Sequence, residues 1–243
     1  MTIKAVIFDI GGVCVGSPIA GIHRYEKLHG LPFNYINVAI VNQGDHGAFQ
    51  KLERSEIKLV DFYKAFGDEL SDPKNKLAYR KYLEKSGKSV PNDIPNVTVD
   101  GKELWEMMMN ETERVDPIVM NAILRLKESG RFITAALTNN SETAQDQNKT
   151  SDSLREIFDY FIESKVVGLR KPDPKFYLHA CKTIGVEPHE TIFLDDIGMN
   201  LRAAKKLGMN TIHVKLGRSE EAIKTLATLV NLDLSSSSSQ SKL

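Results

Sequence analysis

Carboxylate, hydroxyl and amide side chains follow three short apolar runs of this chain. The runs cover residues 3–8, 132–137 and 191–194, and the polar residues that follow them are Asp9, Thr138 with Asn139, and Asp195 with Asp196. Near-continuous apolar runs of this length are typical of strands buried on both faces of a parallel sheet. Because the carboxyl ends of parallel strands meet at one edge, we expect the three polar groups to share a cleft.

The acidic residues at these ends suit phosphoryl transfer assisted by a divalent cation. Such a reaction needs an oxygen nucleophile, a cation that offsets the phosphate charge, and donors for the phosphoryl oxygens. Asp9 can attack phosphorus to form an aspartyl phosphate, and Gly11 and Gly12 let the backbone approach closely. The oxygen ligands that Mg²⁺ prefers would come from the carboxylates of Asp9, Asp195 and Asp196 and the main-chain carbonyl of Gly11.

Four further residues could bind the phosphate group or support the site. Thr138 and Asn139 would bind the phosphoryl oxygens, and Lys171 would offset repulsion between the carboxylates and the phosphate. Asn200 would orient the loop that carries the paired aspartates. Strand-end polar residues also serve as helix caps and turn formers, and a lysine before a proline is often merely solvated. The adjacent aspartates favour the catalytic interpretation, because two carboxylates in one cleft repel each other unless a cation relieves them.

Helical patterns separate the predicted strands. Two Asp-Pro pairs, at residues 116–117 and 173–174, each place an N-cap aspartate before a proline at the first helical position. The predicted elements are helices over 118–129, 174–184 and 199–207 and a further strand over 210–214. Strands that alternate with helices predict an α/β fold with a doubly wound parallel sheet.

Residues 17–111 lack this alternation and show helical periodicity instead. We expect this segment to form an all-helical cap inserted into an α/β core that consists of residues 1–16 and 112–234. Helices of the cap are predicted over 19–29, 36–43, 55–70, 72–86 and 100–112. Residues 87–100, which contain Pro91 and Pro95, are expected to be a surface excursion.

The overall composition excludes several classes of partner. The 243 residues are 41% hydrophobic and 26% charged, and 32 basic residues balance 32 acidic ones. A net charge of zero argues against nucleic acid or a membrane surface as a partner, because both attract basic proteins. The apolar runs fall short of the roughly 18 residues that a membrane span needs. Cys14 and Cys181 are expected to be free thiols in a reducing, intracellular setting.

Residues 235–243 contain five successive serines and end in Ser241, Lys242 and Leu243. We expect a disordered tail, because this segment cannot bury apolar area. Ser-Lys-Leu at a free carboxyl end is the signal read by the peroxisomal import receptor. Localisation to the peroxisome is therefore expected, and a cytoplasmic fraction is compatible with it.

Four motifs resemble those of the haloacid dehalogenase-like (HAD-like) hydrolases. They are residues 8–13 (Phe-Asp-Ile-Gly-Gly-Val), 137–139 (Leu-Thr-Asn), 170–174 (Arg-Lys-Pro-Asp-Pro) and 193–200 (Phe-Leu-Asp-Asp-Ile-Gly-Met-Asn). The last two look most like the phosphatase domain at the N-terminus of mammalian soluble epoxide hydrolase. The resemblance implies a Mg²⁺-dependent phosphatase that forms an aspartyl phosphate and acts on a small phosphorylated metabolite or lipid phosphate. It also implies a Rossmann-like core with a helical cap that selects the substrate.

Gly11 departs from the family pattern, in which most phosphatases have an aspartate two residues after the nucleophile to protonate the leaving alkoxide. Three explanations remain open: a substrate whose leaving group needs no proton, an acid supplied by the cap, or a loss of turnover that leaves a phosphate-binding or partner-binding protein. Candidate cap acids are His46, between Gly44 and Gly47, and His23. Haloacid dehalogenation is a further alternative, but it needs no cation, so the paired aspartates argue against it.

Overall fold

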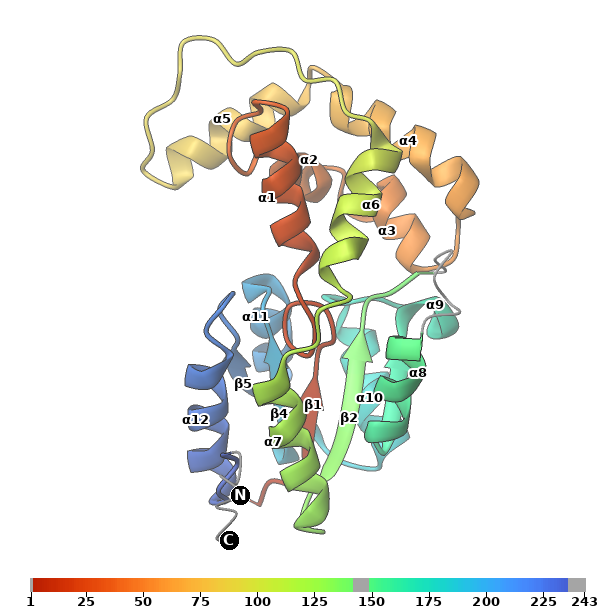
Figure 1. Cartoon of the computed structure of the whole chain (residues 1–243), viewed down its shortest axis with the longest axis vertical. Helices are drawn as coiled ribbons and strands as arrows, with labels where there is room; N and C mark the ends of the chain where they lie inside the picture. Colours follow the sequence, from red (N-terminus) through yellow and green to blue (C-terminus); the bar gives the residue numbers. More distant parts are fainter. Residues whose placement is uncertain (1, 142–148, 236–243) are drawn as a thin grey trace, which may run out of the picture.

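A five-stranded parallel sheet forms the core of the molecule. The computed structural model describes residues 2–141 and 149–235, and within them the strand order is β3-β2-β1-β4-β5 (Figure 1). The strands are β1 (Ala5–Phe8), β2 (Ile133–Thr138), β3 (Tyr160–Glu163), β4 (Thr191–Asp195) and β5 (Asn210–His213). The predicted doubly wound parallel sheet is confirmed, and β3 is a strand that the sequence pattern did not predict.

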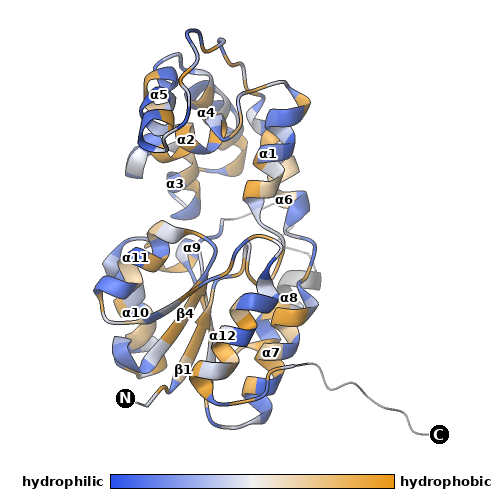
Figure 2. Cartoon of the chain, turned by 90° about the vertical axis from the view of Figure 1, so that its left-hand side faces the viewer, coloured by the Kyte–Doolittle hydropathy of each residue, from blue (hydrophilic) through white to orange (hydrophobic). Residues whose placement is uncertain are grey.

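Helices cover both faces of this sheet. Alternate residues of β1 pack on opposite faces: Val6 and Phe8 share a hydrophobic cluster with α7 (Pro117–Glu128) and α12 (Ser219–Val230). Ala5 and Ile7 share another cluster with α10 (Pro174–Ile184) and α11 (Gly198–Lys206). The other described core helices are α8 (Lys149–Ile157) and α9 (Ser164–Val167). Figure 2 shows the strands in hydrophobic colours between these helices, as expected for a sheet buried on both sides.

Side-chain hydrogen bonds stabilise the first turns of two helices and the edge of the sheet. Asp116 and Asp173 each accept a hydrogen bond of 2.9 Å from a backbone N–H in the first turn of the helix that follows, as their Asp-Pro pairs predicted. At the edge of the sheet, Asp159 accepts hydrogen bonds from the backbone N–H and the hydroxyl of Thr134, at 2.8 and 2.9 Å. Asp159 therefore holds the start of β3 against β2.

Helices from the inserted segment form a second body, which we call the cap. It contains α1 (Pro18–Leu28), α2 (Tyr35–Asn42), the 3₁₀ turn η1 (Gly44–His46), α3 (Ala48–Glu53), α4 (Leu59–Ser71), α5 (Asn75–Lys85) and α6 (Gly101–Glu111). The cap has its own hydrophobic cluster, which includes Phe62, Phe66 and Trp105. Figure 1 shows it above the ends to which the strands point, so its lower side faces the predicted cleft.

Two chain segments connect the cap to the core, and they run side by side. Val15 and Val115 form a β-bridge, the Gly16 N–H donates to the Arg114 carbonyl at 2.9 Å, and the Asp116 N–H donates to the Cys14 carbonyl at 2.8 Å. A Cβ at Gly16 would overlap the main chain of the returning segment, so only glycine permits this close approach. The cap therefore joins the core through one narrow neck.

Parts of the cap differ from the sequence-based expectation. Helix α3 was not predicted, and the helix expected to begin at residue 55 begins at Leu59. Residues 87–100 form no helix or strand, yet Ile94, Val97 and Val99 are buried against the cap cluster. This segment is therefore a strap anchored by apolar side chains and not simply a surface excursion, and its prolines concealed that role by interrupting any periodic pattern.

Within the described residues, no helix has the length and apolar character needed to cross a membrane. Cys14 and Cys181 are both buried and form no disulfide. Ser235 is the last residue described, so residues 236–243 of the expected tail, including Ser241, Lys242 and Leu243, lie outside the described residues.

Candidate active site

Asp9 lies at the carboxyl end of β1, where the chain turns toward the cap. Its backbone N–H donates to the Leu194 carbonyl at 2.9 Å, which holds the end of β1 beside the end of β4. Asp9 Oδ1 accepts a hydrogen bond from the Ile10 N–H at 2.7 Å and lies 2.8 Å from Lys171 Nζ. Two donors thus orient a buried carboxylate at the edge of the sheet.

The two glycines after Asp9 are under different constraints. Gly12 has a φ of +78°, which L side chains rarely adopt, and a Cβ there would overlap the Asp196 carboxylate. Glycine at position 12 therefore lets the first loop pass close to Asp196. A Cβ at Gly11 would meet the Pro18 ring at 3.4 Å, an ordinary van der Waals contact, so a Cβ could be accommodated there.

Lys171 is 1% exposed and joins two carboxylates beneath the cleft. Its Nζ lies 2.8 Å from Asp9 Oδ1 and 2.9 Å from Asp195 Oδ2. Asp195 also accepts hydrogen bonds from the Asn200 amide, at 3.2 and 3.0 Å, and from the Ile197 N–H at 2.7 Å. Burial disfavours the charged ammonium, but Asp195 and Asp9 outweigh it and raise the pKa of Lys171. Lys171 therefore stays protonated between the carboxylates.

Asp196 completes a cluster of three carboxylates. One oxygen from each of Asp9, Asp195 and Asp196 lies within 4.8 Å of the others. The Ser17 hydroxyl donates to Asp196 Oδ2 at 2.9 Å, and His213 Nε2 lies 3.0 Å from the Asp196 carbonyl. Burial, assisted by repulsion from Asp195, raises the pKa of Asp196 to about 6. Burial also raises the pKa of Asp9, although Lys171 opposes this effect.

The carboxylate cluster has the donor chemistry of a Mg²⁺ site. Three acidic groups share the space with a single buried lysine, and a hard divalent cation would relieve their mutual repulsion. Asp9, Gly11 and Asp196 line the cavity between core and cap. Both oxygens of Asp195 already accept hydrogen bonds, so Asp195 is the most fully engaged of the three carboxylates.

The polar residues after β2 support Lys171. Asn139 lines the cavity, its Nδ2 donates to the Lys171 carbonyl at 3.0 Å, and its Oδ1 accepts from the Lys171 N–H at 2.8 Å. Its side chain therefore holds the Lys171 loop. Thr138 is buried at the end of β2, and its hydroxyl makes one long contact of 3.5 Å with the Asn139 carbonyl. Thr138 is not among the residues that line the cavity.

The cavity above Asp9 has a volume of about 350 Å³ and is closed from above by the cap. Its upper wall is mainly apolar and includes Ile19, Ile22, Ile40, Phe49 and Met108. A cap–core ion pair, with Arg170 Nε 2.6 Å from Glu53 Oε2, also lines it. The cavity thus combines a charged floor with a roof that is mainly apolar and also carries the carboxylates of Asp45 and Glu53.

Neither candidate cap histidine lines this cavity. His46 is exposed at the end of η1, whereas its neighbour Asp45 lines the cavity. His23 lies in α1, where its ring packs against Phe33 with centroids 4.5 Å apart. The expectation that His46 of this turn faces the cavity is therefore wrong, and the residue of the turn that lines the cavity is Asp45.

Several site residues were missed at the level of sequence. Ser17 was recognisable as an N-cap before Pro18, but nothing in the sequence indicated its hydrogen bond to a distant aspartate. The Arg170–Glu53 pair joins core and cap, and the sequence does not show which cap residue faces the third motif. His213 belongs to none of the four motifs, yet its Nε2 lies 3.0 Å from the main-chain carbonyl of Asp196 in the fourth motif.

A sequence model of the family described as haloacid dehalogenase-like hydrolase matches residues 3–208. The chain is a HAD-like hydrolase. Among relatives of this hydrolase, mouse acyl-CoA dehydrogenase family member 10 is 30% identical over 232 residues and pig bifunctional epoxide hydrolase 2 is 30% identical over 239. These matches span 95% and 96% of this chain but only 19% and 40% of the relatives, which are much longer proteins.

One relative of similar length is a sesquiterpene phosphatase of Aspergillus oryzae, 27% identical over 215 residues that cover 88% of this hydrolase and 90% of the relative. A solved structure of a HAD family enzyme from Bacteroides thetaiotaomicron, in complex with magnesium and inorganic phosphate, matches with a TM-score of 0.54. It is 19% identical, and the match covers 89% of this chain and 96% of that enzyme. At this identity the likeness shows the shared fold.

Proposed function

We propose that this hydrolase is a Mg²⁺-dependent phosphatase that cleaves small phosphomonoesters through an aspartyl phosphate on Asp9. The observation that carries the proposal is the placement of Asp9, Asp196 and Lys171 around one cavity. The similarity to a phosphatase over nearly the whole chain gives further support.

Each residue of the cluster has a distinct part in the proposed reaction. The Asp9 carboxylate would attack phosphorus, the bond from phosphorus to the ester oxygen would break, and water would later hydrolyse the acyl phosphate. Lys171 would orient Asp9 and offset its repulsion from the phosphate. Asp9, Asp196 and Asp195 would hold Mg²⁺, which when bound neutralises phosphate charge.

The cavity also bears on the choice of substrate. Gly11 supplies no proton to the departing oxygen, so we propose that aryl or acyl phosphates, whose leaving groups are stable without one, react faster than alkyl phosphates. The apolar roof formed by residues such as Ile22, Phe49 and Met108 favours an apolar organic group next to the phosphate.

Phosphate release tests the proposal directly. With an aryl phosphate, we expect release that requires Mg²⁺, stops on chelation and is abolished by Asp9→Asn. Asp116→Asn, at a helix N-cap in the neck, is the matched control and should retain activity. Release that persists in Asp9→Asn would contradict the proposal. Phosphate binding without release from any ester would favour the non-catalytic alternative, and metal-independent halide release would favour a dehalogenase.

We also propose, from the sequence alone, that Ser241, Lys242 and Leu243 bind the peroxisomal import receptor. Deletion of these residues should shift a fluorescent fusion from puncta to a diffuse distribution without altering the fold. Puncta that remain after the deletion would contradict the targeting role.

A further inference from the structure

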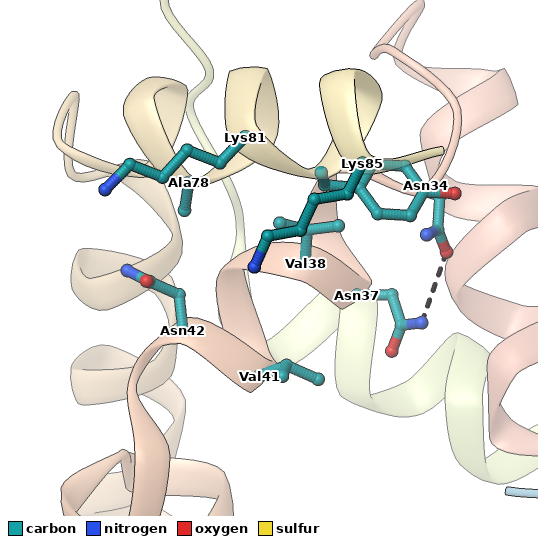
Figure 3. A pocket seen from close by; sticks show the side chains of 9 residues that line it. Asn34, Asn37, Val38, Val41, Asn42, Ala78, Lys81 and Lys85 are labelled. Atoms are coloured by element: carbon teal, nitrogen blue, oxygen red, sulfur yellow. Dashed lines mark hydrogen bonds between the residues drawn. The ribbon is translucent and has the colours of Figure 1, made fainter. Parts of the chain in front are cut away.

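A second hollow, which we call the cap groove, lies in the cap between α2 and α5. It has a volume of about 410 Å³ and is lined on one side by α2 and on the other by α5 (Figure 3). The α2 side presents Asn37 and Val41, and the α5 side presents Lys81, Tyr82 and Lys85. Such a mixture of apolar walls and a few polar groups is typical of a small-molecule site.

The groove carries an unbalanced positive charge. Lys81 and Lys85 are exposed, lie one turn apart on α5, and form no ion pair within the described part of the chain. None of the residues that line the groove is acidic. Figure 3 shows the Lys85 side chain extending from α5 toward α2, into the space above Val41. An anionic group in the groove would therefore meet the Lys85 ammonium and no opposing carboxylate, while the flexible Lys81 side chain, which runs along α5 in Figure 3, starts one turn away.

The groove adjoins the catalytic cavity. Asn37 and Val41, one turn apart on α2, belong to the lining of both hollows. Val41 is 54% exposed although it is apolar, so it offers a surface over which an apolar ligand could pass. A ligand longer than the catalytic cavity could thus continue past these two residues into the groove.

We propose that the cap groove binds a terminal carboxylate of an elongated phosphomonoester whose phosphate group sits at Asp9. This inference rests on the proposed function and narrows its substrate class: phosphate at one end, an apolar middle, and a carboxylate at the other. The middle contacts the apolar roof and Val41, and the carboxylate is held by Lys81 and Lys85. The groove thereby selects among phosphates that the catalytic residues would treat alike.

Equilibrium binding of alkylphosphonates tests the inference without turnover. Two series of graded chain length are compared by titration calorimetry in the presence of Mg²⁺, one ending in a carboxylate and one in a methyl group. Above a threshold length, the carboxylate series should bind the parent protein about fivefold to tenfold more tightly, as two partly solvated ion pairs allow. This preference should weaken as salt concentration rises, because the groove is open to solvent.

Variants of α5 identify the residues responsible. Lys81→Ala and Lys85→Ala should each reduce the preference for the carboxylate series, and the double variant should abolish it, while binding of the methyl series is unchanged. Lys76→Ala removes a charge from the same helix outside the groove and should leave the preference intact. Equal binding of both series at every length, or a preference that survives the double variant, would overturn the inference. Failure of the proposed function has different signatures: neither series binds the parent protein, or both bind but no phosphate ester is hydrolysed.

Discussion

Gly11→Asp would introduce the proton donor that the proposed phosphatase lacks. The backbone at position 11 is outside the left-handed region, and the nearest atoms to a new Cβ are Pro18 Cδ and Cγ, at 3.4 and 3.8 Å. A Cβ therefore fits with little displacement, and we expect the carboxyl group to enter the cavity that Gly11 and Asp9 both line. Three carboxylates already lie close by, and their repulsion favours the protonated form of a fourth, which is the form that donates.

The expected gain follows from the contribution of a general acid. Such groups contribute typically 10²–10⁴-fold, and an acid added without further optimisation should reach the lower end, about 100-fold or roughly 2.7 kcal/mol of barrier. The gain should be confined to esters with poor leaving groups, because aryl phosphates depart without a proton. The parent protein should thus show a steep dependence of kcat/KM on leaving-group pKa, and Gly11→Asp a shallow one.

The assay measures kcat/KM for a series of phosphate esters that differ in leaving-group pKa, with Mg²⁺ present. Gly11→Asn is the matched control, since it has nearly the same volume but cannot donate a carboxyl proton. Thermal unfolding shows whether each variant retains the fold. An unchanged slope in a folded Gly11→Asp variant, or an equal change in Gly11→Asn, would refute the reasoning about the missing acid.

Three further predictions concern stability and metal binding. Lys171→Met should lower the free energy of unfolding in urea by about 3–5 kcal/mol, because it leaves the buried carboxylates of Asp9 and Asp195 without their cation. Lys175→Met, at an exposed position, should leave the free energy of unfolding nearly unchanged. Equal effects of the two substitutions would contradict the stabilising role of the buried ion pairs. Gly12→Ala should lose most of the Mg²⁺-induced rise in Tm, because its Cβ would overlap the Asp196 carboxylate. Gly185→Ala is the control, since Gly185 has a similar positive φ but no atom within 4 Å of a new Cβ, and this variant should keep the rise. Loss of the rise in both variants would show that backbone strain alone is responsible. Partial burial raises the pKa of Asp159, but the hydrogen bonds from Thr134 in β2 outweigh burial and lower this pKa below its ordinary value. The ionised carboxylate therefore stabilises the fold at pH values above its ordinary pKa, and this contribution is lost as the pH falls through the lowered pKa. Asp159→Asn should therefore be less stable than the parent at neutral pH, with the difference shrinking below about pH 4; a constant difference would count against this account.

The core was predictable because its signals are local. Near-continuous apolar runs identified β1, β2 and β4, and Asp-Pro pairs identified the starts of α7 and α10. Strand β3 was not identified, because it is a four-residue segment at the sheet edge that begins with the exposed Tyr160. Its place depends on pairing with β2 and on the hydrogen bonds of Asp159, which no local pattern records.

The site residues of the core were predictable from local sequence signals, whereas those of the cap were not. Strand ends must meet at one edge, so the motifs placed Asp9, Asp195 and Asp196 together correctly. Contacts between core and cap depend on how two bodies pack, and this is why Glu53 and Asp45 were not foreseen and His46 was considered instead. The orientation of a short turn such as η1 cannot be read from residue types, since adjacent residues in it face different directions.

The paired segments of the neck imply that the cap is a replaceable module. Because the outgoing and returning chains are hydrogen-bonded to each other at Gly16 and Arg114, we expect the core to accept a different insert at the same two points without rearrangement of its strands. We expect Asp9 and Lys171 to keep their positions when the insert is exchanged or shortened, because both residues lie on the core and contact each other there. A change of insert would thus alter the cavity wall that the cap supplies, while the contact between Asp9 and Lys171 in the core stays the same.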